Sequence, residues 1–128
     1  MTIHEELADF RSGHPGCHAV VFADLSTGMV LAHSTENKTT QEKLDALCDT
    51  ARKCLNAPFG EALAGAMDAD PQGKPQLAWH RDAEGLYCLI RAVHPAAEAL
   101  CCLVKKDVSI ERLSYDARAV LDLIVTEG

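Results

Sequence analysis

Aromatic residues are scarce in this sequence, and it has no excess of positive charge. Of 128 residues, one is Trp, two are Tyr and three are Phe, and 12 Lys and Arg stand against 19 Asp and Glu. Proteins that bind single strands by stacking need more aromatic side chains, and binding of phosphate backbones requires a basic surface. The formal net charge of −7 therefore argues against a nucleic-acid partner.

Long apolar runs are also missing from the chain. No run reaches the roughly 18 residues that a membrane helix needs, and residues 1–10 are acidic without the apolar centre of a signal peptide. We therefore expect a cytoplasmic protein with no membrane insertion. The length is close to that of a common single domain, so one domain over residues 1–128 is the expectation.

Six cysteines are present, but no two of them have C-x-x-C spacing. A zinc ribbon or a thioredoxin-type pair is therefore not predicted, and a reducing cytoplasm implies free thiols. Because the cysteines fall on predicted strands and apolar helix faces, packing in the core is favoured. A thiol-based enzyme or redox switch remains an alternative hypothesis. The six are Cys17, Cys48, Cys54, Cys88, Cys101 and Cys102.

The spacing of apolar residues predicts the order α-β-β-α-β-β-β-α. Capping boxes at Thr2–Glu5 and Thr39–Glu42 mark two helix starts. The order predicts an α/β sandwich with a five-stranded, mostly antiparallel sheet between helices. One or two helical turns are expected at 62–67 and a loop at 68–75. The helices are expected at 2–12, 40–55 and 109–126, and the strands at 17–25, 29–33, 76–80, 86–93 and 99–104.

One histidine-rich segment, His14-Pro15-Gly16-Cys17-His18, has the residue types of a metal site. A structural zinc site needs four ligands, and no spacing supplies the fourth. Covalent haem attachment fails because His14 takes the place of the first cysteine. Phosphate-loop, nucleophile-elbow and dinucleotide motifs are absent. We therefore expect no cofactor, no metal and no catalytic residues. A small-molecule, haem or metal sensor with a PAS- or GAF-like sheet remains the alternative.

A buried strand, a turn containing glycine and a second short strand occupy residues 19–32, and a capped amphipathic helix follows. Residues 84–93 and 99–104 have the pattern of two closing strands before a C-terminal helix. This arrangement resembles the roadblock/dynein-light-chain family over nearly the whole chain. The resemblance implies a profilin-like (roadblock/longin-type) fold and homodimers or heterodimers. It also implies a non-catalytic scaffold or regulator of a small GTPase or motor-type partner, without a nucleotide site of its own.

In that family the third strand and the middle helix meet their counterparts across a two-fold axis, which implies residues 76–80 and 40–55 here. An exposed edge strand is either protected or paired, and Trp79 would be a rigid anchor on it. Packing of Trp79 on its own core remains equally open. The candidate interface residues are Leu44, Leu47, Cys48, Ala51, Leu77 and Trp79.

Overall fold

The structure is a computed structural model that describes residues 2–36, 38–55, 77–83, 85–92, 98–104 and 109–127. The predicted order of helices and strands is confirmed. The expected helical turns at 62–67 and the loop at 68–75 lie outside the described residues. The elements are α1 (Ile3–Ser12), β1 (Cys17–Asp24), β2 (Met29–Thr35), α2 (Gln41–Leu55), β3 (Leu77–Asp82), β4 (Gly85–Arg91), β5 (Glu98–Val104) and α3 (Ile110–Glu127).

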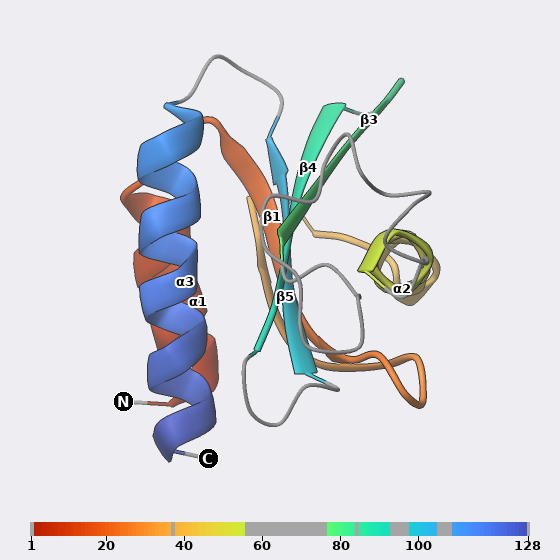
Figure 1. The fold of residues 1–128 in the computed structure, drawn as a ribbon, viewed down its shortest axis with the longest axis horizontal. Coiled ribbons are helices and arrows are strands. Elements are labelled where there is room, and N and C mark those ends of the chain that lie inside the picture. The colour runs from red at the N-terminus through yellow and green to blue at the C-terminus, as the bar shows by residue number, and fades with distance from the viewer. Residues whose placement is uncertain are drawn as a thin grey trace.

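The five strands form one sheet in the order β2-β1-β5-β4-β3, and each neighbouring pair is antiparallel. Helices α1 and α3 cover one face, and α2 covers the other (Figure 1). The molecule is therefore a three-layer sandwich, as the sequence predicts. In this order β2 and β3 are the two edge strands of the described sheet.

The sheet separates two apolar cores, because successive residues of a strand face opposite sides. Val20 and Cys102 belong to the core under α1 and α3, whereas Val21 and Cys101 belong to the core under α2. All four side chains are at most 1% exposed. The two helical layers thus pack on opposite faces of one sheet, each with its own apolar core.

Side-chain caps fix the starts of the helices. The Thr2 hydroxyl accepts a hydrogen bond from the Glu5 amide at 3.1 Å, as predicted for α1. The cap of α2 differs from the prediction: the Thr40 hydroxyl accepts from the Lys43 amide at 3.3 Å, so the cap lies one residue after Thr39. Thr39 and Thr40 each carry a hydroxyl that can cap a helix, and the sequence alone does not say which of the two does so.

The turn between β1 and β2 depends on an aspartate and a glycine. The Asp24 carboxylate accepts from the Ser26 amide at 2.8 Å and from the Ser26 hydroxyl at 2.6 Å. Gly28 has φ +76°, a conformation that glycine adopts at little cost. An added Cβ there would lie 2.8 Å from a guanidinium nitrogen of Arg52 on α2. The turn is therefore fitted against the C-terminal half of that helix.

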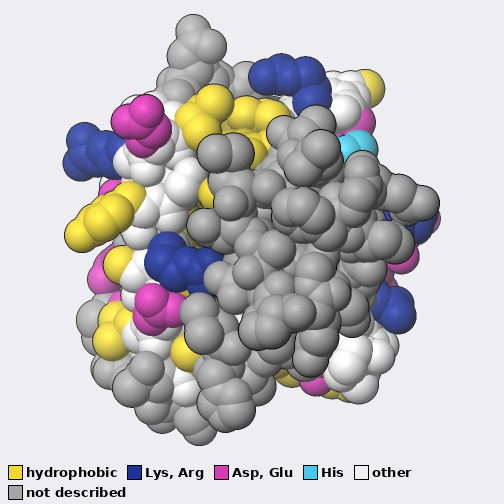
Figure 2. All heavy atoms as spheres, viewed as in Figure 1, with side chains coloured by type: hydrophobic (Ala, Val, Ile, Leu, Met, Phe, Trp, Pro, Cys, Tyr) yellow, Lys and Arg dark blue, Asp and Glu magenta, His cyan; other side chains and the backbone are white. Residues whose placement is uncertain are grey.

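Surface charge is mixed on the face seen in Figure 2. Over the layer of α1 and α3, acidic, basic and isolated apolar side chains are interspersed. Mixed signs of this kind do not create the strong positive field that phosphate backbones select. Among the described residues, no helix combines the length and the apolar character required to cross a membrane.

Candidate interaction surface

Strand β3 borders the sheet and pairs with β4 along one side only within the described sheet. Six residues pair without a register shift, from Leu77 opposite Ile90 to Asp82 opposite Gly85. A regular edge strand presents a row of backbone donors and acceptors to which another strand can pair. The sequence prediction of an edge strand in this place is therefore confirmed.

The side chains of β3 face two different layers. Leu77 and Trp79 are half-buried against the core under α1 and α3. Ala78 is buried in the core under α2. The His80 ring lies edge-on to the Tyr87 ring, with centroids 5.5 Å apart. Trp79 thus packs on its own chain and still keeps part of its surface exposed at the edge.

The predicted apolar stripe of α2 faces the sheet. Leu44, Leu47, Cys48 and Ala51 are buried within the chain, with exposures between 1% and 6%. The Cys101 thiol lies 3.7 Å from the Leu47 carbonyl oxygen and donates to it. The four residues therefore hold α2 on the sheet, and another molecule would reach this helix through its other side.

The six candidate interface residues consequently do not form one patch. Four lie between α2 and the sheet, whereas Leu77 and Trp79 lie on the opposite face of the sheet. Helical periodicity identifies the apolar side of a helix, but it does not say whether that side meets its own sheet or a partner.

The outward side of α2 is polar and mainly charged. Lys53 pairs with Asp49 at 3.0 Å, and the Gln41 amide donates to Asp45 at 2.9 Å. Such exposed pairs contribute little to stability. They leave a hydrophilic helix surface that faces away from the sheet. The exposed residues of this side are Gln41, Glu42, Asp45, Asp49, Arg52 and Lys53, whereas the exposed Lys43 and Ala46 border the space between α2 and the sheet.

The residues of the histidine-rich segment have separate partners. Nε2 of the buried His14 lies 2.9 Å from Oδ2 of Asp116 on α3, and its ring contacts Phe10. His18 instead forms an ion pair through Nδ1 with Glu36. Within the described residues, no three His, Cys, Asp or Glu side chains are grouped to hold a metal ion. The metal-ligand hypothesis for His14, Cys17 and His18 therefore finds no support in this geometry.

The described thiols are free, and most behave as apolar core groups. Burial raises the pKa of Cys88 to about 12 and raises the pKa values of Cys48, Cys54 and Cys101 as well. A hydrogen bond with Cys17 and burial raise the pKa of Cys102. The same hydrogen bond lowers the pKa of Cys17, although this side chain is only 2% exposed. A reactive cysteine needs an accessible thiolate, and none of these six environments combines both properties.

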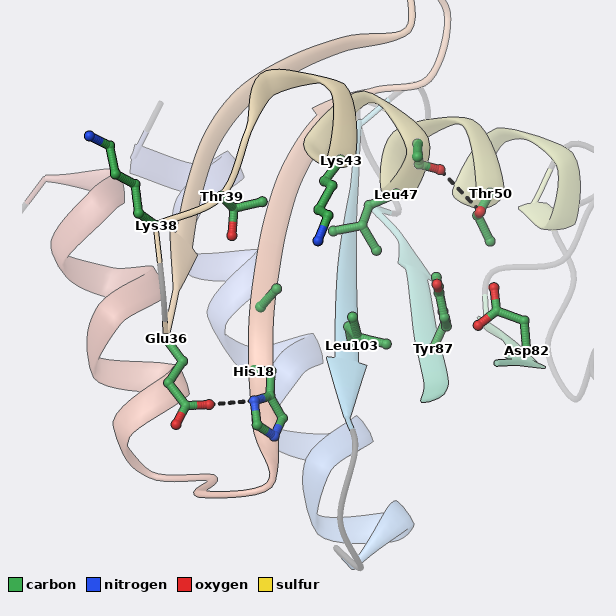
Figure 3. A pocket seen from close by; sticks show the side chains of 12 residues that line it. His18, Glu36, Lys38, Thr39, Lys43, Leu47, Thr50, Asp82, Tyr87 and Leu103 are labelled. Atoms are coloured by element: carbon green, nitrogen blue, oxygen red, sulfur yellow. Dashed lines mark hydrogen bonds and ion pairs between the residues drawn. The ribbon is translucent and has the colours of Figure 1, made fainter. Parts of the chain in front are cut away.

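A cavity of about 420 Å³ lies between α2 and the sheet (Figure 3). It is lined by single residues of separate elements, among them His18 of β1, Lys43 of α2, Tyr87 of β4 and Leu103 of β5. Sequence reasoning did not assemble this group, because its members are far apart in the chain and form no motif. The one local signal is His18, a polar residue near the start of a strand whose middle, residues 19–23, is apolar.

The fold is that of the roadblock and profilin-like domains, which confirms the predicted resemblance at the level of structure. No family model matches the sequence, and no curated protein matches it either. A Roadblock/LC7 domain from Streptomyces avermitilis is similar with a TM-score of 0.76 and 10% identity, over 97% of this chain and 95% of that one. The gliding protein MglB from Thermus thermophilus is similar with a TM-score of 0.72 and 18% identity, over 98% and 90%.

Two further structures extend the comparison. A structure described as MglB with a tetrameric arrangement has a TM-score of 0.73 and 16% identity, over 97% of this chain and 85% of that one. Profilin from Schizosaccharomyces pombe has a TM-score of 0.61 and 10% identity, over 99% of both chains. At such identities the shared property is the fold.

Proposed function

We propose that this chain is a non-catalytic interaction module that forms a dimer through β3 and acts as a scaffold or regulator of a small GTPase or motor-type partner. The observation that carries the proposal is the regular β3 edge, which no described strand covers. Strand addition at such an edge is a common mode of protein recognition. The tetrameric arrangement described for a protein of the same fold supports self-association.

The edge at β3 suits pairing better than the edge at β2. The β1–β2 ladder has a register shift between Phe22 and Ala23, and irregularities of this kind protect an edge from pairing. The β3–β4 ladder has no shift, and Trp79 supplies an aromatic anchor of the type that interfaces concentrate. Pairing of β3 with its copy would extend one sheet through both chains.

The six candidate residues have two roles in this proposal. Leu77 and Trp79 lie at the β3 edge and contact the partner there. Leu44, Leu47, Cys48 and Ala51 hold α2 on the sheet, so that its polar outer side lies beside the second copy. The proposal assigns no catalytic residue and no nucleotide site to the chain.

Dilution of the unmodified protein tests the dimer, because Trp79 is the single tryptophan. We expect light scattering to give twice the chain mass at high micromolar concentration. On dilution, Trp79 fluorescence should shift to longer wavelength as the ring becomes more exposed to water. A monomer at high micromolar concentration, or an emission maximum that does not change with concentration, contradicts the proposal.

Substitution of Trp79 locates the interface. Trp79→Glu should give monomers and Trp79→Phe should keep the dimer, because phenylalanine retains an apolar ring. Leu31→Glu is the matched control, since Leu31 is an apolar residue, 42% exposed, on the opposite edge strand. Circular dichroism identifies folded variants. A folded Trp79→Glu protein that remains dimeric would place the interface elsewhere.

The partner class rests on the resemblance to roadblock domains and is tested separately. Calorimetric titration with small GTPases, each loaded with GDP or with a non-hydrolysable GTP analogue, should give binding that depends on the nucleotide state. Reversal of charge on the outer side of α2, as in Asp45→Lys, should weaken it. Failure of every GTPase tested, with the dimer intact, removes this partner class and leaves the dimer standing.

A further inference from the structure

The cavity between α2 and the sheet has the size of a small-molecule site. Its volume of about 420 Å³ falls within the range of ligand pockets, roughly 300–1,000 Å³. The sheet side and the inner side of α2 contribute apolar surface through Ala19, Leu47 and Leu103. An apolar wall with a few polar groups is the usual composition of such sites.

One of the two lysines at this cavity points into it. Lys43 extends from α2 toward the strands, whereas Lys38, which precedes α2, directs its ammonium group away from the other lining side chains (Figure 3). Within the described residues, neither ammonium group takes part in an ion pair, whereas Lys53 on the same helix pairs with Asp49. Two carboxylates, Glu36 and Asp82, also line the cavity, but Glu36 faces His18, so the Lys43 ammonium group is left available to an anion.

His18 and Glu36 face each other at the same cavity. Nδ1 of His18 donates a hydrogen bond to the Glu36 carboxylate. Nε2 of the ring has almost no accessible surface and no hydrogen-bond partner among the described residues, and in Figure 3 it points away from Lys43. A ligand in the cavity therefore meets the Lys43 ammonium group and not this nitrogen.

We infer that the cavity binds a small organic anion, a carboxylate or a phosphate ester with an apolar body. The Lys43 ammonium group attracts the charged group, and Leu47 and Leu103 contact the apolar body. Asp82, at the far side of the lining from Lys38 in Figure 3, disfavours an anion at that end and so orients the ligand. This site lies on the α2 face and does not depend on the proposed dimer.

Nuclear magnetic resonance titration with simple probes tests the inference. Phenyl phosphate and benzoate are the two anionic probes, and benzyl alcohol and benzylamine are the neutral and cationic controls of similar size. We expect saturable shifts of the Leu47, Thr50 and Leu103 amide signals with at least one anion at concentrations up to about 20 mM. The anion that binds more tightly distinguishes carboxylate from phosphate.

A matched pair of variants assigns the charge contact. Lys43→Met should weaken anion binding about tenfold, because a charge-assisted contact is lost. Lys53→Met, on the same helix but away from the cavity, should leave it unchanged. Absence of saturable shifts for both anions, equal binding of benzylamine, or equal effects of the two variants would overturn the inference.

Discussion

The pair formed by His14 and Asp116 joins the segment between α1 and β1 to α3. His14 is 7% exposed, and its Nε2 lies 2.9 Å from the Asp116 carboxylate. A nearly buried imidazole that loses its partner retains an unsatisfied polar atom. The segment first considered for metal binding therefore has a structural role in the described fold.

Asp116→Ala should lower the free energy of unfolding by about 1–3 kcal/mol, because it leaves His14 without its partner. Asp116→Asn should recover part of this loss, since the amide oxygen still accepts a hydrogen bond. Urea denaturation measures both, and Asp49→Ala, which breaks an exposed pair with Lys53, should cost less than about 1 kcal/mol. A loss for Asp116→Ala no larger than that of the control would contradict this role.

Glu98 and Asp24 lie opposite each other where β1 pairs with β5. Burial, and then the negative charge of Asp24, raise the pKa of Glu98. Hydrogen bonds from the Ser26 hydroxyl and amide lower the pKa of Asp24. As the pH rises, the contribution of Glu98 to folding stability therefore falls, whereas that of Asp24 rises.

A raised pKa means that the folded state binds a proton more tightly than the unfolded state does. Glu98 therefore favours folding at pH values below its unfolded pKa, and this contribution is lost as the pH rises through its folded pKa. Glu98→Gln should raise the free energy of unfolding more at pH 7 than at pH 4, by less than about 1 kcal/mol because the side chain is only partly buried. Urea denaturation at both pH values measures this.

The same substitution in an Asp24→Asn background isolates the role of the neighbouring charge. There the gain from Glu98→Gln should shrink, because one of the two causes of the raised Glu98 pKa is absent. An equal gain in both backgrounds would mean that burial alone acts on Glu98.

At the scale of elements, the β1–β2 turn and α2 fit together at Gly28. Gly28→Ala should lower the free energy of unfolding by about 1–2 kcal/mol, because φ is +76° and the new Cβ would meet Arg52. Gly13→Ala is the matched control: its φ is −76°, and the nearest atom to an added Cβ is at 3.5 Å. Thermal unfolding compares the two.

The Arg52→Ala variant separates the two reasons for which Gly28→Ala should lower the free energy of unfolding. In that background Gly28→Ala should retain the cost of the positive φ and lose the cost of the collision with the guanidinium. If Gly28→Ala is as well tolerated as Gly13→Ala in the unmodified protein, the turn conformation described here is wrong.

The elements themselves were largely predictable from the sequence. Apolar spacing and turn residues identify every described helix and strand, since these signals are local. Whether the apolar side of α2 packs on its own sheet or on a partner was not predictable in the same way. Leu44 and Leu47 form an apolar stripe that suits a core as well as an interface, and only the folded chain places it on the sheet. The cavity group of His18, Lys43 and Tyr87 has no local signal beyond His18 itself, because tertiary structure alone brings the three together.

At the scale of the whole molecule, net charge should control self-association. Each chain carries a formal charge of −7, so two copies repel each other at low ionic strength. Raising NaCl from about 50 to 300 mM should lower the Kd of the proposed dimer by about two- to fourfold, because screening shortens the range of this repulsion. The dilution series with Trp79 fluorescence measures the change.

A dimer that weakens with added salt would contradict this expectation. It would mean that attractive ion pairs across the interface outweigh the repulsion between the whole chains. The Leu31→Glu variant, with one further negative charge per chain, should show a steeper dependence on salt than the parent protein.

Cys101 and Cys102 are neighbours in the chain, yet the sheet assigns them to different cores. Substitutions on its two faces share few side-chain partners, so their energetic effects should be nearly additive where the positions lie more than about 7–10 Å apart. Changes in the α1 and α3 layer should therefore have little effect on the packing of the α2 layer. One sheet in effect divides this chain into two cores whose packing can vary separately.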